Sequence, residues 1–150
     1  MSAPIGIKVV CTNKKARFDF QIGEVYEAGI ALIGSEVKSL RAGMANLRDS
    51  YAWIKEGEVF IENFHIAIYQ QTSRRNLNPL RSRKLLFHKK EIMRLIGKTQ
   101  QKGFTLVPLR VYFKKGRAKV EIGLASRKTL YDRREEIKKK DIERELRRGG

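Results

Sequence analysis

The chain of 150 residues has a single cysteine, Cys11. A lone cysteine excludes an intramolecular disulfide and a metal site built from several cysteines. We therefore expect a protein of a reducing compartment, in which Cys11 is a small, partly buried apolar residue.

Long apolar runs are also missing from this sequence. No stretch approaches the ~20 apolar residues that a membrane-spanning helix needs. The first ten residues lack the basic segment and the apolar run of a secretory signal. These absences predict a cytoplasmic protein that does not act on a membrane.

Catalytic motifs are absent as well. We find no nucleophile placed with a base, no phosphate-binding glycine loop and no metal-ligand spacing. The two histidines, His65 and His88, are far apart, and we expect one to pack in a strand and the other to cap a helix. The sequence predicts a binding protein with no catalytic residues, no metal and no cofactor, and not an enzyme.

Positive charge dominates, with a net charge of +17 and an isoelectric point near 10.3. Residues 1–70 hold eight basic and eight acidic side chains, whereas residues 71–150 hold 25 basic and eight acidic ones. Residues 127–150 carry ten basic and six acidic side chains, so most of the excess lies before them. A surface this positive favours a polyanionic partner, and we expect RNA binding chiefly through the second half.

Short apolar runs bounded by turn residues predict strands at 6–11, 18–22, 26–32, 51–54, 59–66, 104–113 and 118–125. Glu56-Gly57 and Lys115-Gly116 predict tight hairpin turns. Two helices are predicted, one at 35–41 capped by Ser35 and one at 89–102. Many short strands with few helices predict a mainly β fold, an OB-like antiparallel β-barrel with flanking helices.

We divide the chain into a barrel domain, 1–126, and a basic C-terminal tail, 127–150. Acidic and basic residues four apart favour a helix in the tail. Only Ile137, Ile142 and Leu146 could bury apolar surface there, which does not offset the entropy of ordering. The tail is therefore predicted to be disordered alone and helical when docked.

Three basic segments are candidate RNA contacts. The loop at 70–83 contains four arginines, namely Arg74, Arg75, Arg81 and Arg83. In 81–90, five basic residues lie on both sides of Leu85, Leu86 and Phe87, which predicts phosphate contacts beside an apolar surface, or else the solvated start of a helix. Around 112–119, aromatic and basic residues alternate, and Lys119 is a better candidate than Phe113 because strand aromatics usually pack in the core.

Several blocks together resemble one family. They are NKKAR at 13–17, YEAGI at 26–30, GSEVKSLRAG at 34–43, NLRDSYA at 46–52, RKLLFHKKEIMRLIGK at 83–98, LVPLRVYFKKGRAKVEIGLA at 106–125 and LYDRRE at 130–135. They resemble the SsrA-binding protein (SmpB) family, the partners of transfer-messenger RNA in bacterial ribosome rescue. The chain departs from the family at Phe18, where histidine is usual, and at Met44, Asn78, Phe87 and Ser126-Arg127.

The resemblance implies that the barrel binds the tRNA-like domain of transfer-messenger RNA and delivers it to stalled 70S ribosomes for trans-translation. It implies that the tail occupies the decoding site and the empty messenger channel. Elongation factor Tu and alanyl-tRNA synthetase would be met through the RNA. The implied RNA contacts are Lys14, Lys15, Arg17, Phe18, Glu27, Arg41, Asn46, Arg83, Lys84, Leu86, Lys89 and Lys119. The implied ribosome contacts of the tail are Tyr131, Asp132, Arg133, Arg134, Ile137, Lys138 and Lys139.

Glu27 is the unusual member of this set, because phosphate repels a carboxylate. Glu27 must accept a hydrogen bond from a base amino group, or orient a cation such as Lys15 or Arg17. We expect Glu27, Leu86 and Lys119 on one surface. Two other classes stay open: a ribosomal or tRNA-binding accessory protein, and an RNA-modifying enzyme, which would need a catalytic constellation.

Overall fold

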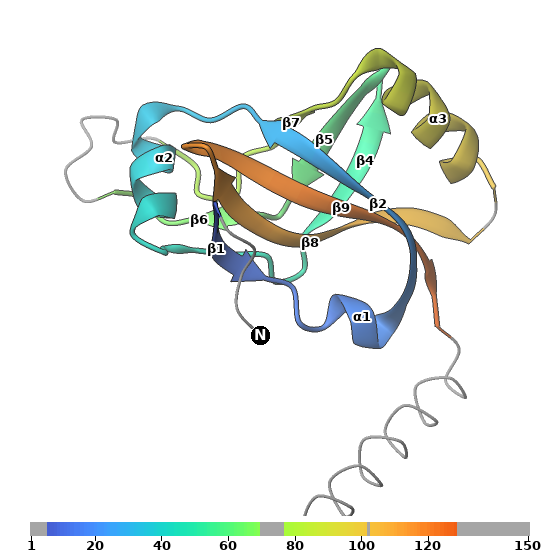
Figure 1. Cartoon of the computed structure of the whole chain (residues 1–150), viewed down its shortest axis with the longest axis horizontal. Coiled ribbons are helices and arrows are strands. Elements are labelled where there is room, and N and C mark those ends of the chain that lie inside the picture. Colours follow the sequence, from blue (N-terminus) through green and yellow to red (C-terminus); the bar gives the residue numbers. More distant parts are fainter. Residues whose placement is uncertain (1–5, 70–76, 102, 129–150) are drawn as a thin grey trace, which may run out of the picture.

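The barrel is a single antiparallel sheet that closes on itself (Figure 1). The structure is a computed structural model that describes residues 6–69, 77–101 and 103–128. Its strand order is β1-β8-β4-β5-β7-β2-β9, and β8 pairs again with β9. The bounds are β1 (Ile7–Thr12), β2 (Phe20–Ile30), β4 (Tyr51–Lys55), β5 (Glu58–Glu62), β7 (Arg83–Leu86), β8 (Phe104–Lys114) and β9 (Arg117–Arg127). The predicted mainly β, OB-like antiparallel barrel is confirmed.

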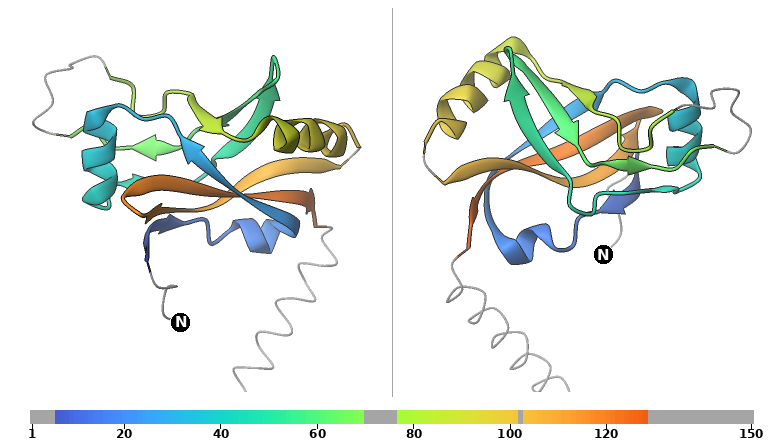
Figure 2. Two further views of the ribbon diagram at one scale, coloured as in Figure 1. Left: turned by 45° about the horizontal axis from the view of Figure 1, so that its top comes forward. Right: turned by 180° about the vertical axis from the view of Figure 1, so that it is seen from behind.

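Smaller elements surround the barrel. Strands β3 (Ala45–Asn46) and β6 (His65–Ile66) form a separate two-stranded sheet. The helices are α1 (Ala16–Asp19), α2 (Gly34–Arg41) and α3 (Lys89–Thr99). Figures 1 and 2 show α2 and α3 at opposite ends of the barrel, with α1 beside the sheet. Helix α1 packs against β8 and β9, where Ala16 forms a second buried cluster with Val107, Leu109 and Ala125.

The core fills the barrel with the inward-facing residues of each strand. Val59, Ile61, Val120 and Ile122 are fully buried, since alternate positions of a strand face the interior. Leu40 of α2 and Leu95 of α3 pack against the same cluster. The helices thus extend the core and fix the two ends of the barrel.

The ring closes unevenly. Strand β8 pairs with β9 along its whole length, from Phe104 opposite Ser126 to Lys114 opposite Arg117. Strand β4 meets β8 through one residue pair, Ala52 with Leu106. The long β8–β9 hairpin is therefore the most continuous part of the barrel.

Both predicted hairpin turns are present. Glu56 and Gly57 have φ angles of 52° and 75°, and Lys115 and Gly116 have φ angles of 52° and 76°. Two consecutive positive φ angles define the tight turn that matches the twist of antiparallel strands, and glycine adopts them without strain. The hairpins β4–β5 and β8–β9 follow from these dipeptides.

Three predicted boundaries were wrong in the first half of the chain. The strands expected at 18–22 and 26–32 are one strand, β2, whose register shifts between Ile22 and Val25. Phe18 lies in α1, which was not predicted. The strand expected at 59–66 divides into β5 and β6 around Asn63, whose φ angle is 56°.

The helix ends also differ. Ile33, not Ser35, precedes the first residue of α2, and its N–H donates to the carboxylate of Glu36 at 3.0 Å. Helix α3 ends at Thr99, three residues earlier than expected.

The last strand, β9, reaches Arg127, and the Lys128 N–H donates to the Asp19 carbonyl at 2.9 Å. The predicted tail helix, with the tail residues from Tyr131 to Lys139, lies outside the described residues. So do Arg74 and Arg75 of the predicted loop. The division into a barrel and a tail stays a prediction.

Candidate RNA interface

Three predicted contacts lie on one outer face of the barrel. Gly29 of β2 pairs with Leu86 of β7 on one side and with Lys119 of β9 on the other. Directly opposed residues of antiparallel strands point to the same face, and Glu27 shares it because it precedes Gly29 by two residues. Leu86 is 52% exposed and belongs to the surface, not to the core. The expectation that Glu27, Leu86 and Lys119 share one surface is confirmed.

The β8–β9 turn forms a hollow around Glu27. Four cationic side chains line it together with this carboxylate: Lys114, Lys115, Arg117 and Lys119. These cations attract a polyanion, while the carboxylate accepts hydrogen bonds and repels phosphate. The hollow therefore suits a ligand that carries negative charge and also a hydrogen-bond donor for Glu27.

Glu27 is held in place by β8. The Tyr112 hydroxyl donates a hydrogen bond to Oε2 of Glu27, and Nζ of Lys114 lies 3.5 Å from the same oxygen. The Tyr112 hydrogen bond lowers the pKa of Glu27, against an opposing effect of burial and with help from the charge of Lys114. Glu27 is thus ionised at neutral pH. The cations beside it are Lys114 and Lys119, not Lys15 or Arg17, the two cations suggested by the sequence.

A second hollow adjoins the first. Its lining includes Lys14, which precedes α1, Arg17 of α1, and Arg110 and Glu121 of the β8–β9 hairpin. Nε of Arg110 donates to Glu121 at 2.9 Å. Glu121 lies directly opposite Glu27 across the β2–β9 pair, so the two hollows meet at this point. We call the resulting surface the basic face; its members are Lys14, Arg17, Glu27, Lys114, Lys115, Arg117 and Lys119.

The remaining predicted contacts are spread over other parts of the surface. Lys15 is exposed and lies 4.0 Å from Asp19, in the same turn as Phe18. Others make local contacts: Arg41 stacks 5.0 Å from the Phe113 ring, Asn46 Oδ1 accepts from the Arg48 N–H, Lys84 pairs with Glu58 at 2.8 Å, and Lys89 begins α3. None of these contacts involves a residue of the basic face.

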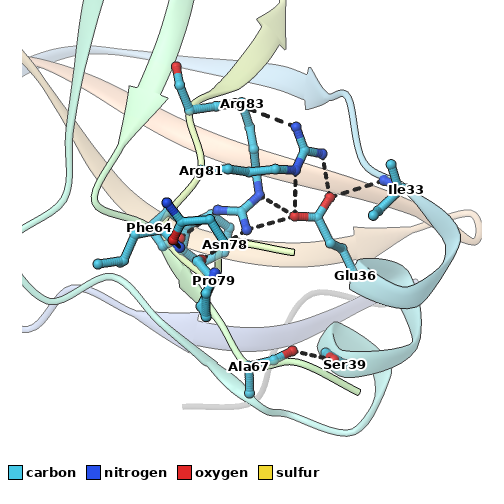
Figure 3. Close-up of polar contacts among 11 residues, drawn as sticks. Ile33, Glu36, Ser39, Phe64, Ala67, Asn78, Pro79, Arg81 and Arg83 are labelled. Atoms are coloured by element: carbon cyan, nitrogen blue, oxygen red, sulfur yellow. Dashed lines mark hydrogen bonds and ion pairs between the residues drawn. The ribbon is translucent and has the colours of Figure 1, made fainter. Parts of the chain in front are cut away.

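The predicted RNA contact at Arg83 was wrong. Its side chain is inside the protein, where the residue is 1% exposed. Nε of Arg83 donates to Oε2 of Glu36 at 2.7 Å, and its other nitrogens donate to the carbonyls of Phe64 and Pro79 (Figure 3). These buried partners occupy the guanidinium and leave no surface for RNA, so we remove Arg83 from the proposed contacts.

Arg81 completes a charged cluster with Arg83 and Glu36. Its Nε and Nη2 donate to the two oxygens of Glu36, at 3.0 and 2.5 Å (Figure 3). Burial alone would raise the pKa of Glu36, but the hydrogen bonds from Arg81, the Ile33 N–H and Arg83 lower it overall. The cluster joins α2 to the segment before β7 and has a structural role.

Arg110 and Glu121 were missed by the sequence analysis, and Tyr112 was noted only as part of the segment 112–119, without its contact to Glu27. The signal for them is the hairpin register, in which Lys114 pairs with Arg117, Tyr112 with Lys119 and Arg110 with Glu121. Because the Lys115-Gly116 turn fixes this register, counting residue pairs outward from the turn would have identified these side chains.

Within residues 6–69, 77–101 and 103–128, no three His, Cys, Asp or Glu side chains are grouped so that they could hold a metal ion. In the same part of the chain, no helix has the length and apolar character needed to span a membrane.

Comparison with known proteins identifies the family. The model of the family described as SmpB protein matches residues 10–149. The chain belongs to the SmpB family. An SsrA-binding protein of Desulforudis audaxviator is 60% identical over 141 residues, which are 94% of this chain and 92% of that protein. One from Geobacter sulfurreducens is 58% identical over 142 residues, covering 95% and 93%.

A solved SmpB structure has the same architecture. It is described as tmRNA-SmpB, a journey to the center of the bacterial ribosome. Its chain is 53% identical to this one and superposes with a TM-score of 0.66, covering 79% of this chain and 84% of that chain. The barrel described above is therefore the SmpB fold.

Proposed function

We propose that this protein binds transfer-messenger RNA, also called SsrA RNA, and delivers it to stalled ribosomes for trans-translation. The observation that supports this most directly is the basic face, in which cations of the continuous β8–β9 hairpin lie around Glu27 of β2. A rigid hairpin presents these groups without a large entropic cost on binding. Membership of the SmpB family names the RNA, because its relatives are SsrA-binding proteins.

The roles of the individual residues follow from their chemistry. Lys14, Lys15, Arg17 and Lys119 are proposed to contact phosphates. Leu86 offers an apolar surface to an unstacked base, and Phe18 can stack where a histidine would also donate a hydrogen bond. Four other residues remain proposed as outer RNA contacts because none is buried: Arg41, Asn46, Lys84 and Lys89.

We assign a separate role to the tail, on the basis of its sequence. Residues after Lys128 would enter the decoding site and the empty messenger channel as a helix, with Arg133, Arg134, Lys138 and Lys139 meeting ribosomal phosphates. Tyr131 would stack on a nucleobase. Asp132 and Ile137 lie in the same segment. Elongation factor Tu and alanyl-tRNA synthetase would be reached through the RNA.

Binding to transfer-messenger RNA should depend strongly on salt. Contact with about five phosphates predicts a slope near −4 for the logarithm of the association constant against the logarithm of salt concentration. Lys119→Gln should reduce this slope by about one unit, whereas Lys55→Gln on the β4–β5 hairpin should not change it. Filter binding over a salt series measures both. An affinity that did not vary with salt would contradict the electrostatic interface.

Glu27 and Lys119 should differ in their effect on specificity. Glu27→Ala should weaken transfer-messenger RNA binding by roughly tenfold and bulk tRNA binding much less, because a base contact carries sequence information. Lys119→Ala should weaken both RNAs by similar factors, because phosphates are common to both. Competition binding with the two RNAs gives the comparison. Equal losses on both RNAs with Glu27→Ala would remove the case for a specific contact.

A further inference from the structure

The two described contacts to Glu27 converge on one of its oxygens. The Tyr112 hydroxyl and Nζ of Lys114 both approach Oε2. Oε1 receives no hydrogen bond from any residue in the described part of the chain. The Glu27 side chain is 37% exposed and lines the hollow. One oxygen is therefore fixed by the protein, and the other is available to a ligand.

Tyr112 is well placed to fix this orientation. The residue is 2% exposed, although its hydroxyl reaches the outer face of the sheet. The Arg110 guanidinium lies 4.9 Å from the centre of its ring and is held by Glu121. Strand β8 is also paired on both sides at this point, with Val9 of β1 and Lys119 of β9 opposite Tyr112. The hydroxyl is thus held from several directions before any ligand arrives, which is the condition for preorganised recognition.

The charges around Oε1 limit what the ligand can be. Lys115, Arg117 and Lys119 line the hollow and attract phosphate, whereas the carboxylate repels phosphate from Oε1. A nucleotide fits both requirements when its base places a hydrogen-bond donor at the carboxylate. Adenine, cytosine and guanine each carry an exocyclic amino group, and uracil carries none.

We propose that Tyr112 is a positioning residue for Glu27, and that Oε1 of Glu27 accepts a hydrogen bond from the exocyclic amino group of one RNA base. This inference rests on the proposed binding of transfer-messenger RNA and adds how one base of that RNA is distinguished. Lys114 shares Oε2 with Tyr112 and fixes the same orientation. The hollow consequently accepts an amino-bearing base and discriminates against uracil.

Removal of single amino groups from the RNA tests the proposal. Pools of transfer-messenger RNA would carry purine riboside, inosine or zebularine at random positions, which delete the amino groups of adenine, guanine and cytosine respectively. Full-length protein would select the bound fraction, and the depleted positions would be mapped. With the wild-type protein, we expect loss of one amino group to weaken binding by roughly tenfold. With Glu27→Ala, removal of the same amino group should have no further effect.

Tyr112→Phe removes the hydroxyl and keeps the ring. It should lower affinity for transfer-messenger RNA by about three- to tenfold, since a hydrogen bond to a charged group is lost, and leave bulk tRNA binding unchanged. Removal of the base amino group should also reduce affinity less in Tyr112→Phe than in the wild-type protein. Tyr26→Phe is the matched control, because the Tyr26 hydroxyl donates to Glu24 on the same strand, at a position that does not line either hollow. It should change neither quantity.

The outcomes separate the two levels of the proposal. An amino-deletion effect that persists in Glu27→Ala, or that no position shows with the wild-type protein, would overturn the reading of a base by Glu27. Unchanged affinity and sensitivity in a folded Tyr112→Phe protein would overturn the positioning role. If Tyr112→Phe does not fold, the Glu27→Ala comparison still decides the base contact. Lys114→Gln, which also releases Oε2, then decides the positioning through its sensitivity to the amino deletion, because its loss of overall affinity includes the loss of one cation. Failure of the wild-type protein to bind transfer-messenger RNA would instead contradict the proposed function.

Discussion

Truncation of the chain after Lys128 is expected to abolish peptide tagging on stalled ribosomes and to leave affinity for transfer-messenger RNA within a few-fold. The shortened protein keeps the contacts of Lys128 with α1, where its N–H donates to the Asp19 carbonyl and its Nζ to the Arg17 carbonyl, each at 2.9 Å. The removed residues carry eight basic and six acidic side chains, so only two of the 17 net positive charges are lost. RNA binding and a reconstituted tagging assay measure the two activities separately.

A variant with an unchanged charge tests the same division of labour. Replacing Ile137 and Ile142 with glycine opposes helix formation by roughly 0.5 kcal/mol per position. Tagging should fall, and RNA affinity should stay at the wild-type level. A truncated protein that still tagged nascent chains, or that lost most of its RNA affinity, would show that barrel and tail do not act separately.

The largest effect on stability is expected from Glu36→Gln. This substitution keeps the shape of the side chain and removes the charge that neutralises Arg81 and Arg83. Breaking a buried ion pair from one side typically costs about 3–5 kcal/mol, because the partner charge stays buried. The free energy of unfolding from urea titration measures the loss. Glu24→Gln is the matched control: it removes an exposed partner of Arg94 and should change stability little.

The same cluster predicts how stability varies with pH. The pKa of Glu36 is lower in the folded protein than in the unfolded chain, so its contribution is fully present above the ordinary carboxyl pKa. The contribution is lost as pH falls below that value. Wild-type protein should therefore lose more stability than Glu36→Gln on acidification to about pH 3. Equal losses in the two proteins would argue that Glu36 does not carry this effect.

Local turn chemistry explains why most of the barrel could be predicted. Glu56-Gly57 and Lys115-Gly116 each force a tight turn between two apolar runs, and both hairpins follow. Strand β7 could not be found in this way because two of its four residues have inverted polarity. Arg83 faces the interior and Leu86 faces solvent, whereas a half-buried strand is recognised by apolar residues facing inward.

The same inversion explains the error in the site. Arg83 lies in a basic segment and has the composition of an RNA contact, but its pairing opposite the buried Ile61 places it inside the barrel. Tyr112 is the reverse case, because a core-like aromatic residue contributes to the surface site. It is almost fully buried, yet its hydroxyl reaches Glu27, 85 positions away in the sequence. Leu86 and Lys119 were candidates from their basic segments, whereas Glu27 was identified only through the family resemblance. The proximity of the three could be known only from the register of three strands.

The uneven closure of the ring has a consequence for local unfolding. The single pair between Ala52 and Leu106 joins β4 to β8, so opening the ring there breaks fewer hydrogen bonds than separating β8 from β9. Segments held by few backbone hydrogen bonds open at a lower free energy than the rest of a domain. The β4–β5 hairpin can therefore exchange its amide hydrogens along this seam while Glu27, Tyr112 and Lys119 keep their arrangement on the intact β2–β9–β8 ladder.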